Sequence, residues 1–445
     1  MSKEHRWLAA EIDRWVADGV ITPEQGAVLR ARHPVPAESA AAGFSWGLIV
    51  FFALGAIVVG LGVVLLFAYN WAFIPKVGKL AIVFGAIVAA HGAGVYFRLK
   101  ADWRSMLGEG LLVLGTMLFG AGIWLVAQIY NIDEHFPTGF LVWGLGALAL
   151  AWAIPSIAQA IVATIVLTIW GAVEVLEFGQ AVDWATLLMI GGLGTLVWRL
   201  RSAVLTAVVL AGLYVHILTN AAHWGGAGTA FVVAMALSTA MIALGTLVRG
   251  GSPMPRSAGA VMRFFGLTGF LFCAYVLSFG DVADDVLRST LRMRESAALE
   301  TAYRWTMCAL ALGAWVAVFG RNARAGRRLG ETEQWFYPLG LIAVFGMTVA
   351  GFYEGEVLLA VIFNLVLLGV SGLWIVRGCR EGRLRSVVLG SIILGLLVFA
   401  RYFDLFDSLA ARGLAFLLFG GALFAEGFFY RKMRQTGGET AGGVR

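Results

Sequence analysis

Residues 228–248 read GTAFVVAMALSTAMIALGTLV, a stretch that contains no charged side chain. As an α-helix rising 1.5 Å per residue, it would measure about 31 Å, which matches the hydrocarbon thickness of a bilayer. Similar apolar stretches recur from residue 47 onward, and short polar connections separate them. This repetition predicts a chain that crosses a membrane many times.

The composition of the whole chain supports this prediction. Hydrophobic residues make up 60% of its 445 residues, and charged residues make up 13%. A soluble domain has roughly 45–50% apolar and about 25% charged residues. The composition therefore excludes a soluble enzyme, a disordered chain and a disulfide scaffold, and it indicates an integral membrane protein.

Fourteen membrane-spanning helices are expected, because about 20 apolar residues span the hydrocarbon core and about 17 suffice. The predicted spans are 47–69, 77–97, 107–130, 138–154, 156–176, 183–199, 202–219, 228–248, 261–279, 303–320, 335–352, 357–377, 386–401 and 412–430. Only Pro155 and its neighbours separate the fourth span from the fifth, so the number of spans there stays open. The predicted fold class is all-α, a polytopic transmembrane helix bundle of about 14 spans.

The distribution of basic residues predicts the orientation of this bundle. With the N-terminus in the cytoplasm, 25 of the 33 Lys and Arg residues fall in cytoplasmic segments and 8 fall in outer segments. Basic residues favour the cytoplasmic side of a membrane. An even number of spans with both termini in the cytoplasm therefore agrees best with the sequence.

The first 35 residues carry charges throughout and are predicted to form a cytoplasmic helical hairpin. Apolar residues recur at helical spacing in its first half, namely Trp7, Leu8, Ile12, Trp15 and Val16. Thr22 precedes Pro23 and Gln25, which is typical of a capping box that starts a second helix. Such a small hairpin is expected to dock on the bundle or on a cytoplasmic protein partner. The predicted domains are the hairpin at 1–35, a linker at 36–46, the bundle at 47–430 and a cytoplasmic tail at 431–445.

One connection is longer than the others. Residues 280–302 interleave charged residues with Val282, Val286, Leu291 and Leu299. This pattern is typical of an interfacial helix on the outer face, and a solvated helical linker explains it equally well.

Several short motifs together carry a family resemblance. They are Trp15 followed by Gly19-Val20-Ile21-Thr22-Pro23-Glu24-Gln25, then Ala68-Tyr69-Asn70-Trp71, Ala127-Gln128-Ile129-Tyr130-Asn131, and Ala400-Arg401-Tyr402-Phe403-Asp404-Leu405-Phe406. As a set they resemble a family of bacterial predicted membrane proteins labelled as a domain of unknown function. The resemblance is clearest over residues 1–145 and 386–430. It implies a location in the bacterial inner membrane, and it supplies no activity.

Three of these motifs stand where a long apolar run stops, at the predicted outer face. Their polar and aromatic members are Asn70, Trp71, Gln128, Tyr130, Asn131, Arg401, Tyr402 and Asp404. One interpretation is structural, since aromatic rings and capping groups belong at the membrane interface. The other is a shared outward-facing pocket in which Arg401 binds an anionic group, because its planar fork suits carboxylate or phosphate. Asp404 is an alternative partner for Arg401.

Ionisable and polar residues near or inside the predicted spans are further candidates. Glu174 and Glu177 share one helical face and either bind cations or protons or belong to a solvated helix end. The intramembrane candidates are His91, Glu109, His216, Asn364 and Glu426. Each is a hypothesis for handling substrate or protons, and each has a structural alternative. Hydrogen bonds between helices explain His91 and Asn364, and Glu109 and Glu426 can reach the headgroup region.

The sequence indicates no cofactor, metal or nucleic-acid partner. Asp133, Glu134 and His135 are consecutive, and consecutive side chains do not naturally converge on one ion. The three cysteines form no CxxC pair. Basic residues spread over many short loops fit membrane orientation better than a nucleic-acid groove.

Three functions fit these features. The preferred one is a transporter or a carrier of lipid or envelope components. The alternative is a non-catalytic membrane scaffold or sensor that binds a partner through its N-terminal hairpin. The third is a membrane enzyme that acts on a lipid-linked substrate with Glu174, Glu177 and Arg401. A cavity reaching His91 or Asn364 would favour transport, a filled bundle would favour the scaffold, and a cleft joining the three charged residues would favour the enzyme. Under the pocket hypothesis, Arg401→Ala is expected to lose function and still fold.

Overall fold

The computed structural model describes residues 11–32, 74–100, 104–132, 135–248, 256–292, 298–326, 333–350 and 354–405, with isolated positions between 417 and 425. All regular elements in these ranges are helices, and they include no strand. Eight of these helices are long and apolar enough to cross a membrane, and three shorter ones are also apolar. The predicted all-helical membrane fold is confirmed.

The chain divides into two compact units, residues 1–79 and 80–445. In the first unit, residues 11–17 form a helix, and α2 (Pro23–Arg32) follows a short turn. The predicted capping box is present, because the backbone N of Thr22 donates to Gln25 Oε1 at 3.0 Å and Gln25 N donates to Thr22 Oγ1 at 3.3 Å. Ile12 is buried, and a Cβ atom at Gly26 would lie 2.6 Å from Val16 Cγ2. The two helices therefore pack against each other.

Four helices follow: α4 (Lys76–Arg98), α5 (Arg104–Tyr130), α6 (Pro137–Ala153) and α7 (Ile157–Leu176). They match the second to fifth predicted spans within a few residues. The chain leaves the helical conformation around Pro155, and Ser156 then caps α7 by accepting a hydrogen bond from Gln159 N at 3.1 Å. Helices α6 and α7 are thus two separate elements that pack together.

The next predicted span, 183–199, is one continuous helix made of α8 (Trp184–Leu188), the π-helix η2 (Met189–Gly194) and α9 (Thr195–Leu200). Helix α10 (Ala203–Val248) contains two predicted spans, because the backbone at Gly225 and Gly226 is not helical. Gly226 has φ 64°, a value that glycine adopts readily. The Tyr214 hydroxyl lies 3.4 Å from Ser238 Oγ, whereas 24 residues of straight helix measure about 36 Å. The two halves of α10 therefore fold back on each other.

The remaining elements are α11 (Arg256–Leu277), α12 (Gly280–Arg292), α13 (Ala298–Arg324), the 3-10 helix η5 (Glu333–Trp335), α14 (Phe336–Ala350), α15 (Glu356–Arg380) and α16 (Leu384–Leu405). Apart from α12 and η5, they correspond to the ninth to thirteenth predicted spans. The first predicted span, 47–69, lies outside the described residues, and of 412–430 only isolated positions are described. The predicted domain boundaries and the count of fourteen spans stay predictions.

Helix α12 occupies the long connection that the sequence singles out. Its apolar residues Ala283, Val286 and Leu287 are buried in the core, and Asp281 and Arg288 on its other face are exposed. A hydrogen bond to Asp284 and the charge of this carboxylate raise the pKa of Arg288 above its ordinary value. The apolar face of α12 therefore packs on the bundle itself.

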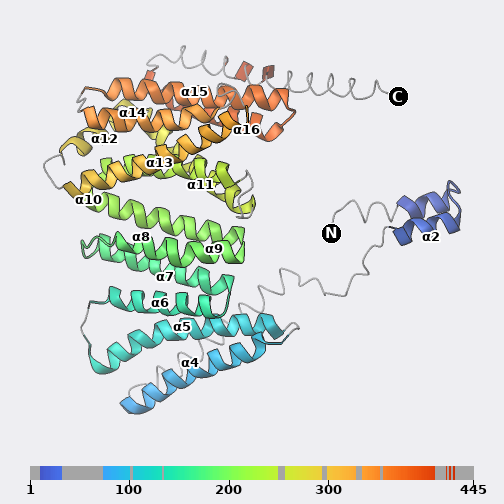
Figure 1. Cartoon of the computed structure of the whole chain (residues 1–445), viewed down its shortest axis with the longest axis vertical. Helices are drawn as coiled ribbons and strands as arrows, with labels where there is room; N and C mark the ends of the chain where they lie inside the picture. Colours follow the sequence, from blue (N-terminus) through green and yellow to red (C-terminus); the bar gives the residue numbers. More distant parts are fainter. Residues whose placement is uncertain are drawn as a thin grey trace. The chain divides into compact units, whose positions relative to one another are not determined.

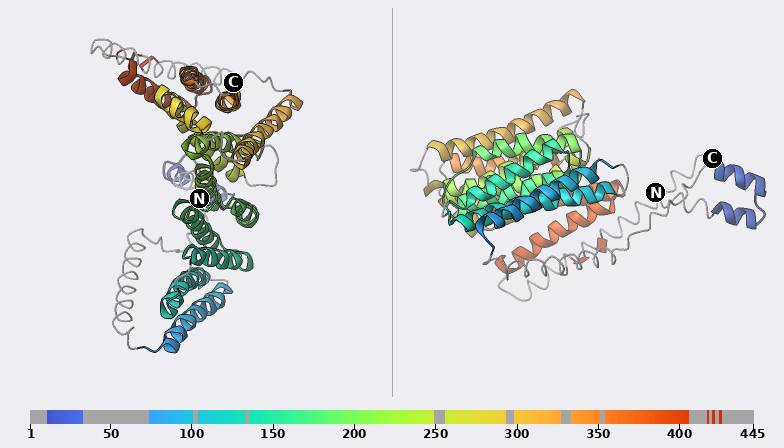
Figure 2. Two further views of the ribbon diagram at one scale, coloured as in Figure 1. Left: turned by 90° about the vertical axis from the view of Figure 1, so that its left-hand side faces the viewer. Right: turned by 90° about the horizontal axis from the view of Figure 1, so that it is seen from below.

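In the second unit, successive helices run in alternating directions (Figures 1 and 2), and several neighbours in the chain pack side by side, as α6 does with α7, α10 with α11 and α15 with α16. Their connections consequently gather at two ends. We call the end at which α4, α6, α9, α13 and α15 finish the basic end. Arg98, Arg199, Arg321, Arg377 and Arg380 lie at or beside it. The other end, at which α5, α7, α11, α14 and α16 finish, we call the opposite end.

Candidate functional site

Helices α4 and α5 are closest near the basic end and separate beyond it. A Cβ atom at Gly94 would lie 2.9 Å from the backbone N of Leu112, and one at Gly108 would overlap the backbone N of Arg98. Further along, side chains stand between the helices. A Cβ atom added at Gly115 would lie 2.5 Å from Nδ1 of His91, and one added at Gly122 would lie 3.0 Å from Cγ1 of Val83. This divergence leaves space between α4, α5 and α6 toward the opposite end.

The larger space, which we call the first hollow, has a volume of about 410 Å³. Its lining comes from 83–87 of α4, 119–127 of α5 and 132–142 around the start of α6. The lining side chains are aliphatic and aromatic except for His135 and Thr138. Volume and lining are those of ligand pockets, which measure roughly 300–1,000 Å³ and are mostly apolar with a few polar groups.

One of these polar groups, His135, contacts the buried carboxylate of Glu174 at the opposite end. Nε2 of His135 lies 2.8 Å from Glu174 Oε2, and Trp170 Nε1 donates to Glu174 Oε1 at 3.1 Å. Glu174 is 7% exposed, whereas Glu177 is exposed. The two glutamates of the predicted pair thus have different surroundings, and Glu174 fixes the imidazole that lines the first hollow.

A second hollow of about 390 Å³ follows toward the basic end. His91, Thr116, Phe119, Gly146, Ala149, Leu150 and Ala153 line it. Phe119 lines both hollows, and its ring lies against Gly146, where a Cβ atom would be 2.7 Å from Cε1. The two hollows are therefore neighbours along the same three helices, with one aromatic ring at their boundary.

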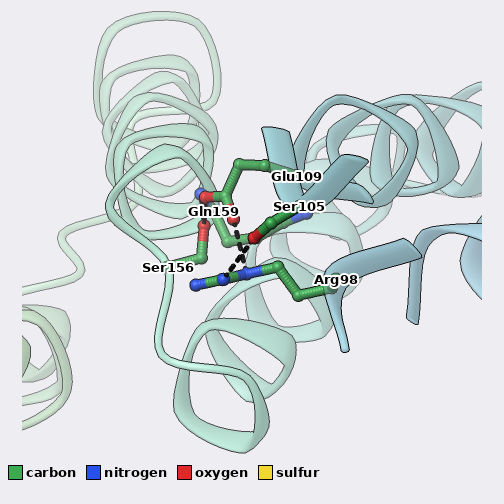
Figure 3. Close-up of polar contacts among 5 residues, drawn as sticks. All are labelled: Arg98, Ser105, Glu109, Ser156 and Gln159. Atoms are coloured by element: carbon green, nitrogen blue, oxygen red, sulfur yellow. Dashed lines mark hydrogen bonds and ion pairs between the residues drawn. The ribbon is translucent and has the colours of Figure 1, made fainter. Parts of the chain in front are cut away.

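A chain of polar contacts connects the second hollow with the basic end, and Figure 3 shows its part from Gln159 to Arg98. The Thr116 hydroxyl donates to Gln159 Oε1 at 2.9 Å. The Ser156 hydroxyl donates to Glu109 Oε1, and Glu109 Oε2 lies 3.1 Å from Arg98 Nε. Arg98 Nη1 also donates to Ser105 Oγ at 3.0 Å. These contacts tie α4, α5 and α7 together at one place.

Residues 13–159 match the family model of the predicted membrane proteins DUF2157. The predicted resemblance to a family of membrane proteins of unknown function is thus confirmed over this part of the chain. No curated protein and no solved structure matches the chain. The matched part contains every residue that lines either hollow and all five residues in Figure 3.

The predicted intramembrane residues have different surroundings. His91 lines the second hollow, and Glu109 belongs to the polar chain. His216 is fully buried, and among the described residues neither of its ring nitrogens has a hydrogen-bond partner. Asn364 Nδ2 donates to Ser278 O at 3.0 Å and to Ala360 O at 2.8 Å, so it joins α15 to the end of α11. Glu426 lies outside the described residues.

Arg401, the central residue of the predicted outer pocket, binds the end of a helix. Its Nη2 donates to Ser278 O at 2.6 Å and to Ser278 Oγ at 3.0 Å, and its guanidinium lies 4.6 Å from the centre of the Phe279 ring. The structure thus shows a partner other than the proposed anion. Glu174 has different partners from Arg401, and α7 and α16 lie at separate places in the second unit (Figure 1).

The other members of the predicted pocket are only partly described. Gln128, Tyr130 and Asn131 are exposed at the end of α5, which is separated from α16 in Figure 1. Asn70 and Trp71 lie outside the described residues, as do the side chains of Tyr402 and Asp404. The described motifs at the ends of α5 and α16 are not brought together, and convergence of all three stays a prediction.

Sequence reasoning missed Thr116, Phe119, Ser156 and Gln159. Two of them have a signal in the sequence. Ser156 stands between Pro155 and an apolar run, which is the position of an N-cap, and Gln159 is an amide inside a predicted span. A phenylalanine among many others in apolar helices gives no such signal.

Proposed function

We propose that the protein is a membrane carrier that binds a molecule with one acyl-type chain in the first hollow. The observation that carries this proposal is the hollow itself, an apolar space of about 410 Å³ lined by α6 and by α4 and α5, two helices that are long and apolar enough to cross a membrane. An apolar chain gains little by leaving lipid for a protein unless shape and a polar anchor select it. His135, held by Glu174, is one polar group in the lining of this hollow, and the second hollow, which adjoins the first at Phe119, offers others.

The same proposal includes an orientation and a location. The basic end would face the cytoplasm, because Lys and Arg favour that side, and His135 would then face outward. A bacterial inner-membrane protein with both termini in the cytoplasm fits this arrangement. Residues 1–35 would remain on the cytoplasmic side, available to a protein partner.

The scaffold alternative is supported by the other half of the bundle. Helices α10 to α16 share one continuous core that includes Phe270, Trp315 and Phe363, each almost fully buried. Ligand binding and scaffolding are compatible, since the hollows lie in α4–α6. The enzyme alternative is not proposed, because Glu174 and Arg401 have separate partners.

Photo-crosslinking in lipid nanodiscs tests the carrier proposal. A monoacylglycerol with a diazirine in its chain is expected to label peptides of α5 and α6 in the wild type. Val142→Trp would fill the first hollow and abolish this labelling. Val215→Trp is the matched control, because Val142 and Val215 are similarly exposed, at 45% and 43%, and only Val142 lines the hollow.

Two results would contradict the proposal. One is equal labelling of the wild type and the Val142→Trp variant. The other is a disulfide between a cysteine at position 142 and one introduced within residues 47–69, together with no labelling by the lipid. That result would show that the first predicted span fills the hollow.

A further inference from the structure

The second hollow offers hydrogen-bonding groups of one particular kind. Nδ1 of His91 lies 2.9 Å from Ile87 O, and a carbonyl only accepts, so Nδ1 carries a hydrogen, and a ring with one hydrogen has Nε2 as an acceptor. The single hydroxyl hydrogen of Thr116 is shared between Gln159 Oε1 and Leu112 O, which leaves the lone pairs of the hydroxyl oxygen available. Both groups can therefore accept hydrogen bonds from a ligand.

Beside these acceptors lies a buried donor. Nε2 of Gln159 is without a hydrogen-bond partner among the described residues, and Gln159 is fully buried. Gln159 does not itself line the second hollow, and it is linked to the lining through the hydrogen bond that its amide oxygen accepts from Thr116. A buried amide N–H left unpaired destabilises the fold, and this indicates that a polar group belongs nearby.

The electrostatic environment indicates a neutral ligand. No charged side chain is among the residues that line the second hollow. The ion pair of Arg98 and Glu109, which is connected to Thr116 through Ser156 and Gln159, is neutral as a pair. A phosphate or carboxylate there would have no counter-charge from the lining, and an unpaired charge on apolar helices within a membrane is strongly unfavourable.

We propose that the second hollow binds a neutral hydroxyl- or amide-bearing group and that the Phe119 ring separates this site from the first hollow. The inference rests on the proposed carrier function, because the chain of the same molecule would occupy the first hollow. Phe119 is suited to this role since it lines both hollows and its ring lies on Gly146, where no side chain hinders it. Rotation of this one ring would join the two spaces.

Binding of two probes to the full chain in nanodiscs tests the inference. A monoacylglycerol has a neutral hydroxyl head, and a fatty acid of equal chain length has a carboxylate. Thr116→Val removes the hydroxyl, and loss of one net hydrogen bond is expected to weaken binding of the monoacylglycerol about three- to tenfold. Binding of the fatty acid should remain unchanged. His91→Phe, a second variant, removes the ring nitrogens and is expected to act in the same direction.

Thr164→Val is the matched control. Thr164 is buried and donates to a backbone carbonyl of its own helix, as Thr116 does, but it does not line either hollow. This control should bind both probes like the wild type. In Phe119→Ala, a diazirine placed near the head of the monoacylglycerol should label 149–153 more strongly than in the wild type.

The outcomes separate this inference from the carrier proposal. If both probes bind and Thr116→Val and His91→Phe weaken them equally or not at all, the head-group site is wrong and the carrier proposal stands. Absence of binding by the wild type would overturn both. Unchanged labelling of 149–153 in Phe119→Ala would overturn the role of Phe119 as the boundary.

Discussion

The ring of Phe119 lies directly on the backbone of Gly146, where an added Cβ atom would be 2.7 Å from ring atom Cε1. The Phe119 ring on α5 thus packs on α6 at a residue without a side chain, at the boundary between the two hollows. The position of the ring depends on the absence of a side chain at position 146. This dependence can be tested without knowledge of the ligand.

Gly146→Ala is expected to displace the Phe119 ring and to destabilise the protein by about 1–3 kcal/mol, the usual cost of overpacking. Thermal unfolding in nanodiscs would measure the change. Gly92→Ala is the control, since no atom of the described residues outside its own helix backbone lies within 4 Å of a Cβ at that position. If the two variants unfold at the same temperature, the contact between ring and glycine does not constrain the fold.

Gly108→Ala should be more damaging, because its Cβ atom would overlap the backbone of Arg98 rather than a movable side chain. We expect a loss of at least about 3 kcal/mol or failure to insert, since two helix backbones must move apart. Gly110→Ala on the same helix has open space and should resemble the wild type. Expression level and thermal unfolding of the two variants give the comparison, and similar values would contradict the close crossing of α4 and α5.

Arg401→Ala is now expected to destabilise the protein, contrary to the expectation from the sequence alone. The substitution leaves the Ser278 carbonyl at the end of α11 without its charged donor, and hydrogen bonds to charged groups contribute about 1.5–3 kcal/mol. Arg401→Lys keeps a charge and should recover part of this loss. Unfolding of both variants would be measured in the absence of any ligand. A fully stable Arg401→Ala variant would restore the hypothesis of an anion-binding arginine.

His216→Leu is predicted to leave stability unchanged or to raise it. Neither ring nitrogen of His216 has hydrogen-bond geometry to a described residue, although the backbone of Val182 is near it, and replacing an unsatisfied buried polar group by an apolar one of similar size is close to neutral. The comparison is Asn220→Ala, one turn further along α10. It removes the acceptor of Val182 N, a 2.8 Å hydrogen bond, and should be destabilising. Strong destabilisation by His216→Leu would mean that the ring has a bound partner such as water.

The helices were predictable because bilayer thickness imposes one length on every span. Even the two spans inside α10 follow from the polar break at His223–Gly226, and the Ser156 cap explains the short break at Pro155. The hollows were not predictable, since they depend on which faces of α4, α5 and α6 meet. The same applies to Arg401, whose acceptor is a backbone carbonyl 123 residues away and has no sequence signature.

Cysteine labelling tests the orientation on which the proposed location depends. Gln128 is exposed near the opposite end, and Glu381 is exposed at the basic end. The three native cysteines are buried, so single cysteines at these positions would be the accessible thiols among the described residues. In intact spheroplasts, an impermeant maleimide should label Gln128→Cys, and it should label Glu381→Cys only after permeabilisation. The reverse pattern would place the basic end outside, against the distribution of Lys and Arg, and would direct His135 and the first hollow to the cytoplasm.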